Sequence, residues 1–176
     1  MRNLRRVCGI GLAATAVLAA TVGTAAAEPA ATTPLSDQDR SYLLTSHQTN
    51  MAEIALGARA AVSSCAAVRD LGAMLVADHT RLEAMSAPVA FGNGVALSPL
   101  PDADHMATLQ RVSTLTGPDF DQQWLRTQQL GHLDALAAGQ NEALYGTSAQ
   151  VRQLADAASP VVAQHLVLAR QAVTRC

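Results

Sequence analysis

Three histidines and one glutamate could meet inside this protein if its chain folds as a bundle of helices. His79, His132 and His165 lie on the apolar faces of three predicted helices, and Glu53 borders the apolar face of a fourth. With the connections argued below, their heights along the bundle differ by about three residues, or roughly 5 Å. Imidazole nitrogens and a carboxylate oxygen can bind one zinc, iron or copper ion. These four residues are therefore a candidate mononuclear metal site.

The same four residues also suit a structural interpretation, which we favour from the sequence alone. A buried histidine is usually neutral and hydrogen-bonded to a carboxylate or a carbonyl group. Asp78, Asp121 and Gln128 could support such a polar network in the core. Asp78 points about 100° away from the adjacent His79, so the two cannot chelate one ion, and Asp78 is expected either to orient a neighbour or to cap a polar contact. The absence of any Glu-x-x-His sequence disfavours a di-iron carboxylate centre.

The elements that would position these side chains are four long helices and one short one. Apolar residues recur every three or four positions, and no stretch of useful length alternates as a strand does. Glycine, proline and serine clusters mark the breaks between the helices. Glu83 is expected on an outward face. The predicted helices cover residues 37–62, 65–92, 102–115, 118–145 and 149–172, with Ser36, Ser64 and Ser148 as N-caps.

The two cysteines outside the N-terminal segment, Cys65 and Cys176, indicate how the helices are connected. In an oxidising compartment such a pair most simply forms a disulfide, and two unpaired thiols are the alternative. In a plain up-and-down bundle the two cysteines would lie roughly 40 Å apart. If residues 92–117 cross the length of the bundle, both reach the same end, as a disulfide with Cα atoms within about 7 Å requires. The pairing therefore predicts an all-α, ferritin-like four-helix bundle with a long crossover that contains the short helix.

The first 27 residues have the features of a secretory signal peptide. Arg2, Arg5 and Arg6 precede an apolar stretch at 7–20, and the alanines at 25–27 fit a cleavage site before Glu28. No long apolar span follows, so we expect no transmembrane helix after cleavage. Residues 28–35 are predicted to be a flexible leader and residues 36–176 a single domain. The protein is therefore expected to be exported, to the periplasm, to the cell envelope or out of the cell.

Charge and motifs exclude several classes of function. The chain has 12 basic residues, three of them in the predicted signal peptide, and 14 acidic residues, all outside it. A net negative mature chain is poorly suited to nucleic acid. No glycine-rich phosphate loop, nucleophile elbow or Cys–His dyad is visible. We expect a non-enzymatic protein without an established cofactor, with a single bound transition-metal ion as the alternative; the sequence identifies no substrate, partner or oligomeric state.

Several short motifs run through the predicted helices: Asn50-Met51-Ala52-Glu53, residues 71–79 (LGAMLVADH), Phe120-Asp121 with His132, and Pro160 with His165-Leu166. Together they resemble a bacterial family known as domain of unknown function 4142. The resemblance covers about Leu35 to Ala172, and Trp124 stands where that family more often has tyrosine. It implies an exported protein with a ferritin-like fold, of a kind often labelled as an outer membrane protein. It implies no reaction.

Overall fold

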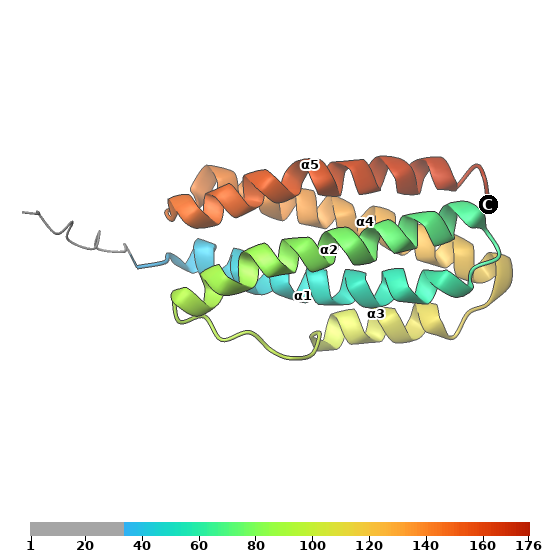
Figure 1. The fold of residues 1–176 in the computed structure, drawn as a ribbon, viewed down its shortest axis with the longest axis horizontal. Helices are drawn as coiled ribbons and strands as arrows, with labels where there is room; N and C mark the ends of the chain where they lie inside the picture. Colours follow the sequence, from blue (N-terminus) through green and yellow to red (C-terminus); the bar gives the residue numbers. More distant parts are fainter. Residues whose placement is uncertain (1–33) are drawn as a thin grey trace, which may run out of the picture. The chain divides into compact units, whose positions relative to one another are not determined.

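The computed structural model describes residues 34–176, and in them the chain forms an all-α bundle, as predicted (Figure 1). The proposed signal peptide and residues 28–33 of the proposed leader lie outside the described residues. No helix in the described part is long and apolar enough to cross a membrane. The elements are α1 (Asp37–Arg59), a 3-10 turn η1 (Ala60–Val62), α2 (Ala66–Gly92), α3 (Ala103–Ser113), α4 (Gly117–Tyr145) and α5 (Ala149–Ala172).

The helix starts follow the capping signals in the sequence, with one exception. Ser36 caps α1 in a reciprocal capping box with Asp39, and Ser148 caps α5. At α2 the N-cap is Cys65, without a side-chain hydrogen bond, and not Ser64 as predicted. The chain makes an extra 3-10 turn after α1 and thereby shifts the start of α2 by one residue.

The segment between α2 and α4 crosses the length of the bundle. In Figure 1, α1 and α2 run in opposite directions, α3 returns along the bundle beside α1, and α4 then runs parallel to α2. The structure therefore has the predicted crossover topology. Cys65 and Cys176 form the predicted disulfide, with their Cα atoms 5.7 Å apart and 111 residues between them in sequence.

The apolar core consists of two clusters with the polar layer between them. The cluster at the disulfide end contains Phe120, Trp124 and Leu75, and the indole of Trp124 donates a 2.9 Å hydrogen bond to the carbonyl of Leu56. The second cluster lies at the opposite end of the bundle. Leu35, which was assigned to the flexible leader, is buried there, so the ordered domain begins before residue 36. The second cluster comprises Leu35, Tyr42, Leu43, Val89, Ala90, Val95, Val151 and Ala155.

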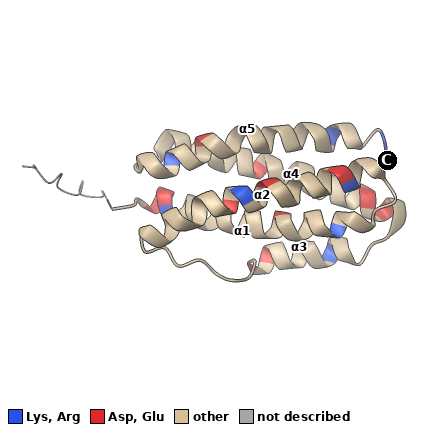
Figure 2. Ribbon diagram, viewed as in Figure 1, with Lys and Arg blue, Asp and Glu red and all other residues tan. Residues whose placement is uncertain are grey.

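Most charged residues of the described helices are exposed, whereas Asp39, Glu53, Asp121 and Glu142 are buried. In the view of Figure 2, arginines and acidic residues are interspersed along the described helices. Asp39 is fully buried and accepts hydrogen bonds from Ser36, Thr147 and Ser148. Burial alone would raise the pKa of Asp39, but these hydrogen bonds outweigh it and hold the pKa well below its usual value. Asp39 thus ties the start of α1 to the turn between α4 and α5.

Helices α1 and α2 approach each other closely at a pair of glycines. A Cβ atom on Gly57 would lie 2.6 Å from the carbonyl oxygen of Gly72, and one on Gly72 would collide with the side chain of Ala60. Side chains at these positions would push the two helices apart. The glycines therefore set the spacing of the helix pair that carries Asn50 and His79.

We predict that Gly72→Ala lowers the free energy of unfolding by about 1–3 kcal/mol, because the added methyl group overpacks the helix contact. Gly92→Ala is the matched control, since nothing lies within 4 Å of its Cβ position. It should change stability by no more than about 1 kcal/mol, in the stabilising direction. Denaturant titrations of both variants measure the difference. Equal stability of Gly72→Ala and the wild type would show that the close contact does not set the helix spacing.

Replacement of both cysteines by serine should lower the free energy of unfolding by about 2–5 kcal/mol, because the unfolded chain is then no longer constrained by a long closed loop. The measurement is unfolding of the double variant beside the oxidised wild type. The reduced wild type serves as the control and should resemble the variant. A double variant as stable as the oxidised wild type would contradict the expected effect of the crosslink.

Candidate functional site

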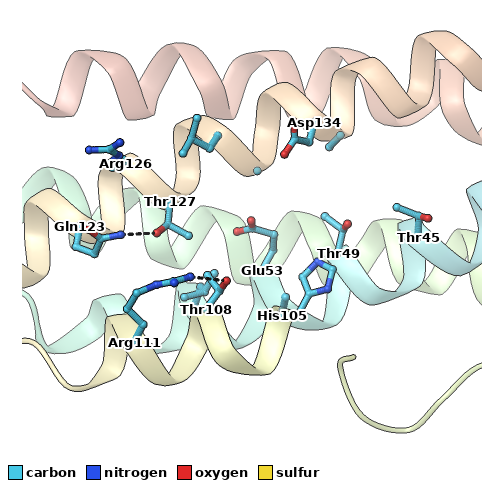
Figure 3. Close-up of a pocket in the computed structure, with 15 residues that line it drawn as sticks. Thr45, Thr49, Glu53, His105, Thr108, Arg111, Gln123, Arg126, Thr127 and Asp134 are labelled. Carbon is cyan, nitrogen blue, oxygen red and sulfur yellow. Dashed lines mark hydrogen bonds between the residues drawn. The ribbon is translucent and has the colours of Figure 1, made fainter. Parts of the chain in front are cut away.

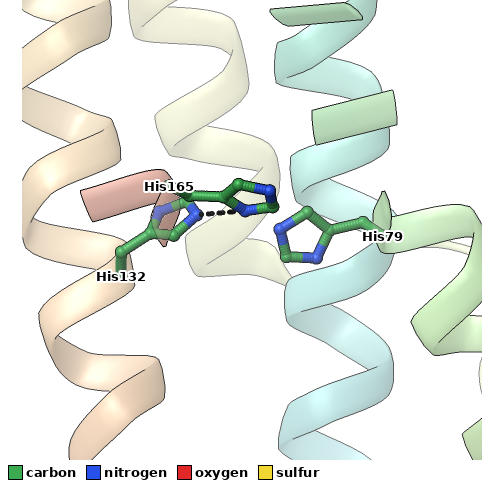
Figure 4. A group of neighbouring side chains, drawn as sticks. All are labelled: His79, His132 and His165. Carbon is green, nitrogen blue, oxygen red and sulfur yellow. Dashed lines mark hydrogen bonds between the residues drawn. The ribbon is translucent and has the colours of Figure 1, made fainter. Parts of the chain in front are cut away.

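Three histidines from three helices meet in the polar layer of the bundle. His79 comes from α2, His132 from α4 and His165 from α5, and each is at most 2 % exposed. Their ring centroids are 5.3–5.8 Å apart, and one nitrogen from each ring lies within 4.8 Å of those of the others (Figure 4). The structure thus brings together the three histidines that the sequence placed on inner faces.

The outer nitrogens of two rings are held by acceptors, which fixes their protons. His79 Nδ1 lies 2.9 Å from Oδ1 of Asn50, and His132 Nδ1 lies 2.8 Å from the carbonyl of Gln128. Both partners accept hydrogen bonds, so Nδ1 is the protonated nitrogen in each neutral ring. Nε2 is then left with a lone pair, and Nε2 of His79 is buried without a partner.

The amide of Asn50 is oriented in its turn by Glu83. The amide nitrogen of Asn50 donates to Oε2 of Glu83 at 3.2 Å. A carboxylate can only accept, so the amide must turn its oxygen toward His79. Glu83 also accepts a 2.7 Å hydrogen bond from Nδ1 of His47, whose Nε2 donates to the carbonyl of Ser98 in the crossover. A chain of hydrogen bonds therefore links His79 to the crossover.

His165 faces both an acid and another histidine. Its Nε2 lies 3.1 Å from Oδ2 of Asp78, and its Nδ1 lies 3.3 Å from Nε2 of His132. In the neutral ring the proton lies on Nε2, where the carboxylate accepts it, and Nδ1 turns a lone pair toward His132. In the protonated ring both nitrogens donate and Asp78 balances the charge. Asp78 thus contacts His165 on another helix and not its sequence neighbour His79.

Burial keeps two of the rings neutral. Desolvation, followed by repulsion from His132 and His165, lowers the pKa of His79 to about 3. Desolvation and repulsion from His165 lower the pKa of His132 to about 4, against the opposite effect of the Gln128 carbonyl. Both rings are therefore neutral at pH 7 and able to act as lone-pair donors.

Glu53 was predicted to join the histidines, but the structure directs it elsewhere. It is absent from the group of converging ligand atoms and lines a cavity between α1, α3 and α4 (Figure 3). On α1 it is Asn50 that reaches the histidines. Three residues correspond to about 60° around a helix, enough to turn Glu53 toward α4. Desolvation raises the pKa of Glu53 to about 8, and the nearby amide of Gln128, which lies outside hydrogen-bond distance, opposes this rise only in part.

The other predicted supporting residues lie at separate places. Asp121 is buried near the disulfide and accepts a short hydrogen bond from the hydroxyl of Ser63, which ties α4 to the turn before α2. Gln128 contributes its backbone carbonyl to His132, while both polar atoms of its side-chain amide lack a partner within 3.5 Å. Asp102 and His105 form a partly exposed pair on α3.

The sequence interpretation missed Asn50, Glu83 and His47 as parts of the site. Asn50 and His47 stand on the apolar face of α1, which was the available signal, since a polar residue on such a face needs a partner. Glu83 was expected to face outward. Its side chain is only 20 % exposed, and it contacts His47, which in turn contacts the crossover at Ser98. No pattern in α2 itself indicates these contacts.

The raised pKa of Glu53 predicts how stability depends on pH. Above about pH 4.5 the unfolded chain releases the proton of Glu53, whereas the folded protein keeps it up to about pH 8. The folded state binds more protons in this range, so stability falls as the pH rises. Glu53→Gln should remove this fall, and its stability relative to the wild type should rise by a few kcal/mol, in order of magnitude, between pH 5 and pH 9.

Unfolding curves of both proteins in a chelator, across this pH range, make the comparison. Asp104→Asn, at an exposed acid on α3, is the control and should follow the wild type at every pH. Parallel profiles of Glu53→Gln and the wild type would rule out a buried, protonated Glu53.

The comparisons with known proteins agree with the resemblance seen in the sequence. Residues 24–172 match the family described as domain of unknown function DUF4142. No curated protein and no solved structure matches the chain. Because the match covers most of its length, the chain belongs to the DUF4142 family.

Proposed function

We propose that this DUF4142 protein binds a single transition-metal ion through Nε2 of His79, Nε2 of His132 and Nδ1 of His165. The observation that supports this most is the convergence of three buried ring nitrogens from three helices. In their neutral tautomers all three direct lone pairs to one point. In the metal-free protein the lone pairs of the three buried nitrogens repel one another. A bound metal ion removes this repulsion, because each nitrogen then donates its lone pair to the ion.

The spacing of the nitrogens suits a small ion. Two nitrogens bound at 2.0–2.1 Å to a tetrahedral zinc lie about 3.3 Å apart. The distance from His132 Nε2 to His165 Nδ1 is 3.3 Å. The remaining separations, which reach at most 4.8 Å, need only small changes in ring torsions to close on the same ion.

The partners of the outer nitrogens match those of metal-binding histidines. Such a histidine commonly donates its other N–H to a carboxylate, carbonyl or similar acceptor, which orients the ring and raises its basicity. Asn50, the Gln128 carbonyl and Asp78 provide these acceptors for the three rings. The negative charge of Asp78 also offsets part of the charge of a bound cation.

The donor set favours certain metals. Three imidazoles suit zinc, copper or iron and suit magnesium or calcium poorly. Of the original four candidate ligands only the three histidines remain, since Glu53 faces the neighbouring cavity. We propose zinc as the reference ion.

The proposed setting is outside the cytoplasm. The disulfide between Cys65 and Cys176 is typical of an oxidising compartment, and residues 1–27 carry the features of a signal peptide. The proposal is thus an exported metal-binding protein, to which no reaction is assigned. A charge-neutral polar network in the core is the alternative use of the same residues.

The free energy of unfolding, measured with and without zinc, distinguishes a metal site from a purely structural polar network. Zinc at 100 times its dissociation constant should stabilise the wild type by about 2.7 kcal/mol relative to chelator. His132→Gln should lose most of this gain, because it removes a ligand. His105→Gln, at a partly exposed histidine on α3, is the control and should keep it. Equal stability of the wild type in chelator, zinc and copper would reject the metal site and leave the structural network.

A further inference from the structure

A second site, distinct from the histidines, lies in the groove between α1, α3 and α4. The cavity there has a volume of about 620 Å³, within the range of small-molecule sites. Its side chains come from all three helices (Figure 3). The crossover creates it, because α3 is laid beside α1 and α4 without filling the space between them. The proposed metal site makes no use of this cavity.

At the floor of the cavity lies a carboxyl group that the protein leaves without a partner. Glu53 is 4 % exposed, and its Oε2 makes no hydrogen bond with any described residue. Its other carboxyl oxygen lies beside Gly131, where a Cβ atom would be 3.4 Å from it. A buried polar atom without a partner costs free energy, and a ligand with a hydrogen-bond donor would recover it.

The charges around the cavity are divided between its two ends. Figure 3 shows Arg111 on α3 and Arg126 on α4 toward one end of the cavity, on opposite sides of it, with Glu53 in the middle and Asp134 beyond Glu53. Arg126 and Asp134 are eight residues apart on α4, which corresponds to about 12 Å along the helix. One end thus suits an anion, and the region of Glu53 and Asp134 suits a cation.

The distance between these regions limits the size of the ligand. Arg126 and Gly131, the residue beside Glu53, are separated by about 7.5 Å along α4. Two extended residues span about 7 Å. The wall between them is formed by Ala52, Leu56, Leu130 and threonine side chains, so the body of the ligand meets mostly carbon.

From these features we propose that the groove binds a short zwitterion of dipeptide length, with its carboxylate between Arg111 and Arg126 and its ammonium group at Glu53 and Asp134. Arginine forks bind carboxylates well. In the ligand-free protein Glu53 keeps its proton up to about pH 8, so binding of the ammonium group displaces this proton and Oε2 then accepts a hydrogen bond from the ammonium group. The two charges and their spacing provide the selectivity, and the apolar wall accepts a small aliphatic side chain.

Calorimetry and amide NMR with the dipeptide Ala-Leu test this proposal on the purified protein in a chelator, where the histidine site is free of metal. The same measurements use N-acetyl-Ala-Leu, which lacks the ammonium group, and Ala-Leu amide, which lacks the carboxylate. The wild type should bind Ala-Leu about tenfold more tightly than either capped form, as expected for the loss of one charged hydrogen bond. The amide signals of Thr49, Thr127 and Gly131 should shift.

Variants of the cavity show which side chains bind the ammonium group of the dipeptide and which bind its carboxylate. Glu53→Gln combined with Asp134→Asn should bind Ala-Leu and its N-acetylated form equally, and Arg111→Gln combined with Arg126→Gln should bind Ala-Leu and its amide equally. Asp104→Asn and Arg170→Gln remove exposed charges outside the cavity and should behave as the wild type does.

The comparison of the free and capped dipeptides needs only the wild type, so it holds even if a variant fails to fold. No binding of Ala-Leu at millimolar concentration would overturn the proposal. Equal affinity for the three compounds, or NMR shifts confined to residues outside the groove, would overturn it as well. Zinc binding at the histidines is measured separately, so its failure leaves this result unaffected.

Discussion

The need to satisfy three imidazole rings in a buried layer constrains the rest of this structure. Each ring has two nitrogens, and none of them can reach bulk water. One nitrogen of each ring finds an acceptor: Asn50 on α1, the Gln128 carbonyl on α4 and Asp78 on α2. The histidines themselves come from α2, α4 and α5. The polar layer therefore connects all four long helices, and a change in the rotation or height of any one would leave a buried nitrogen unpaired.

The remaining features of the fold keep those helices at the required height. An apolar cluster lies on each side of the histidine layer, and apolar packing resists displacement along the helix axes. The disulfide and the Ser63–Asp121 hydrogen bond join the helix ends at one pole, while Asp39 joins α1 to the α4–α5 turn at the other. The crossover enables this arrangement, because only a parallel α2 and α4 place Cys65 and Cys176 at the same pole. It also contacts His47, the partner of Glu83, and forms the groove around Glu53.

Much of the fold was predictable because it rests on local signals and on one long-range constraint. Breaks at glycine, proline and serine mark the helix ends to within a few residues, and the cysteine pair selects the crossover. The three histidines were found because each lies on an apolar helix face. Glu53 was misplaced because α1 is buried against α2, α3 and α4, so several of its faces are internal. Periodicity shows that Asn50 and Glu53 both point inward, but not which neighbour each meets. Glu83 could not be assigned either, because its partners His47 and Asn50 lie on another helix and the position of His47 depends on the distant Ser98.

The proposed metal site requires three ring nitrogens that present lone pairs to a common point, and the protonation state of each ring shows whether they do. Long-range ¹H–¹⁵N NMR of the histidine rings, recorded at pH 7 on metal-free protein, identifies the tautomer of each ring. We expect protons on Nδ1 of His79, on Nδ1 of His132 and on Nε2 of His165, with the other nitrogen of each ring unprotonated. We also expect these three unprotonated nitrogens to change their shifts when zinc is added. A doubly protonated His165 that donates to both His132 and Asp78, unchanged by zinc, would contradict the account and identify the cluster as a structural ion pair.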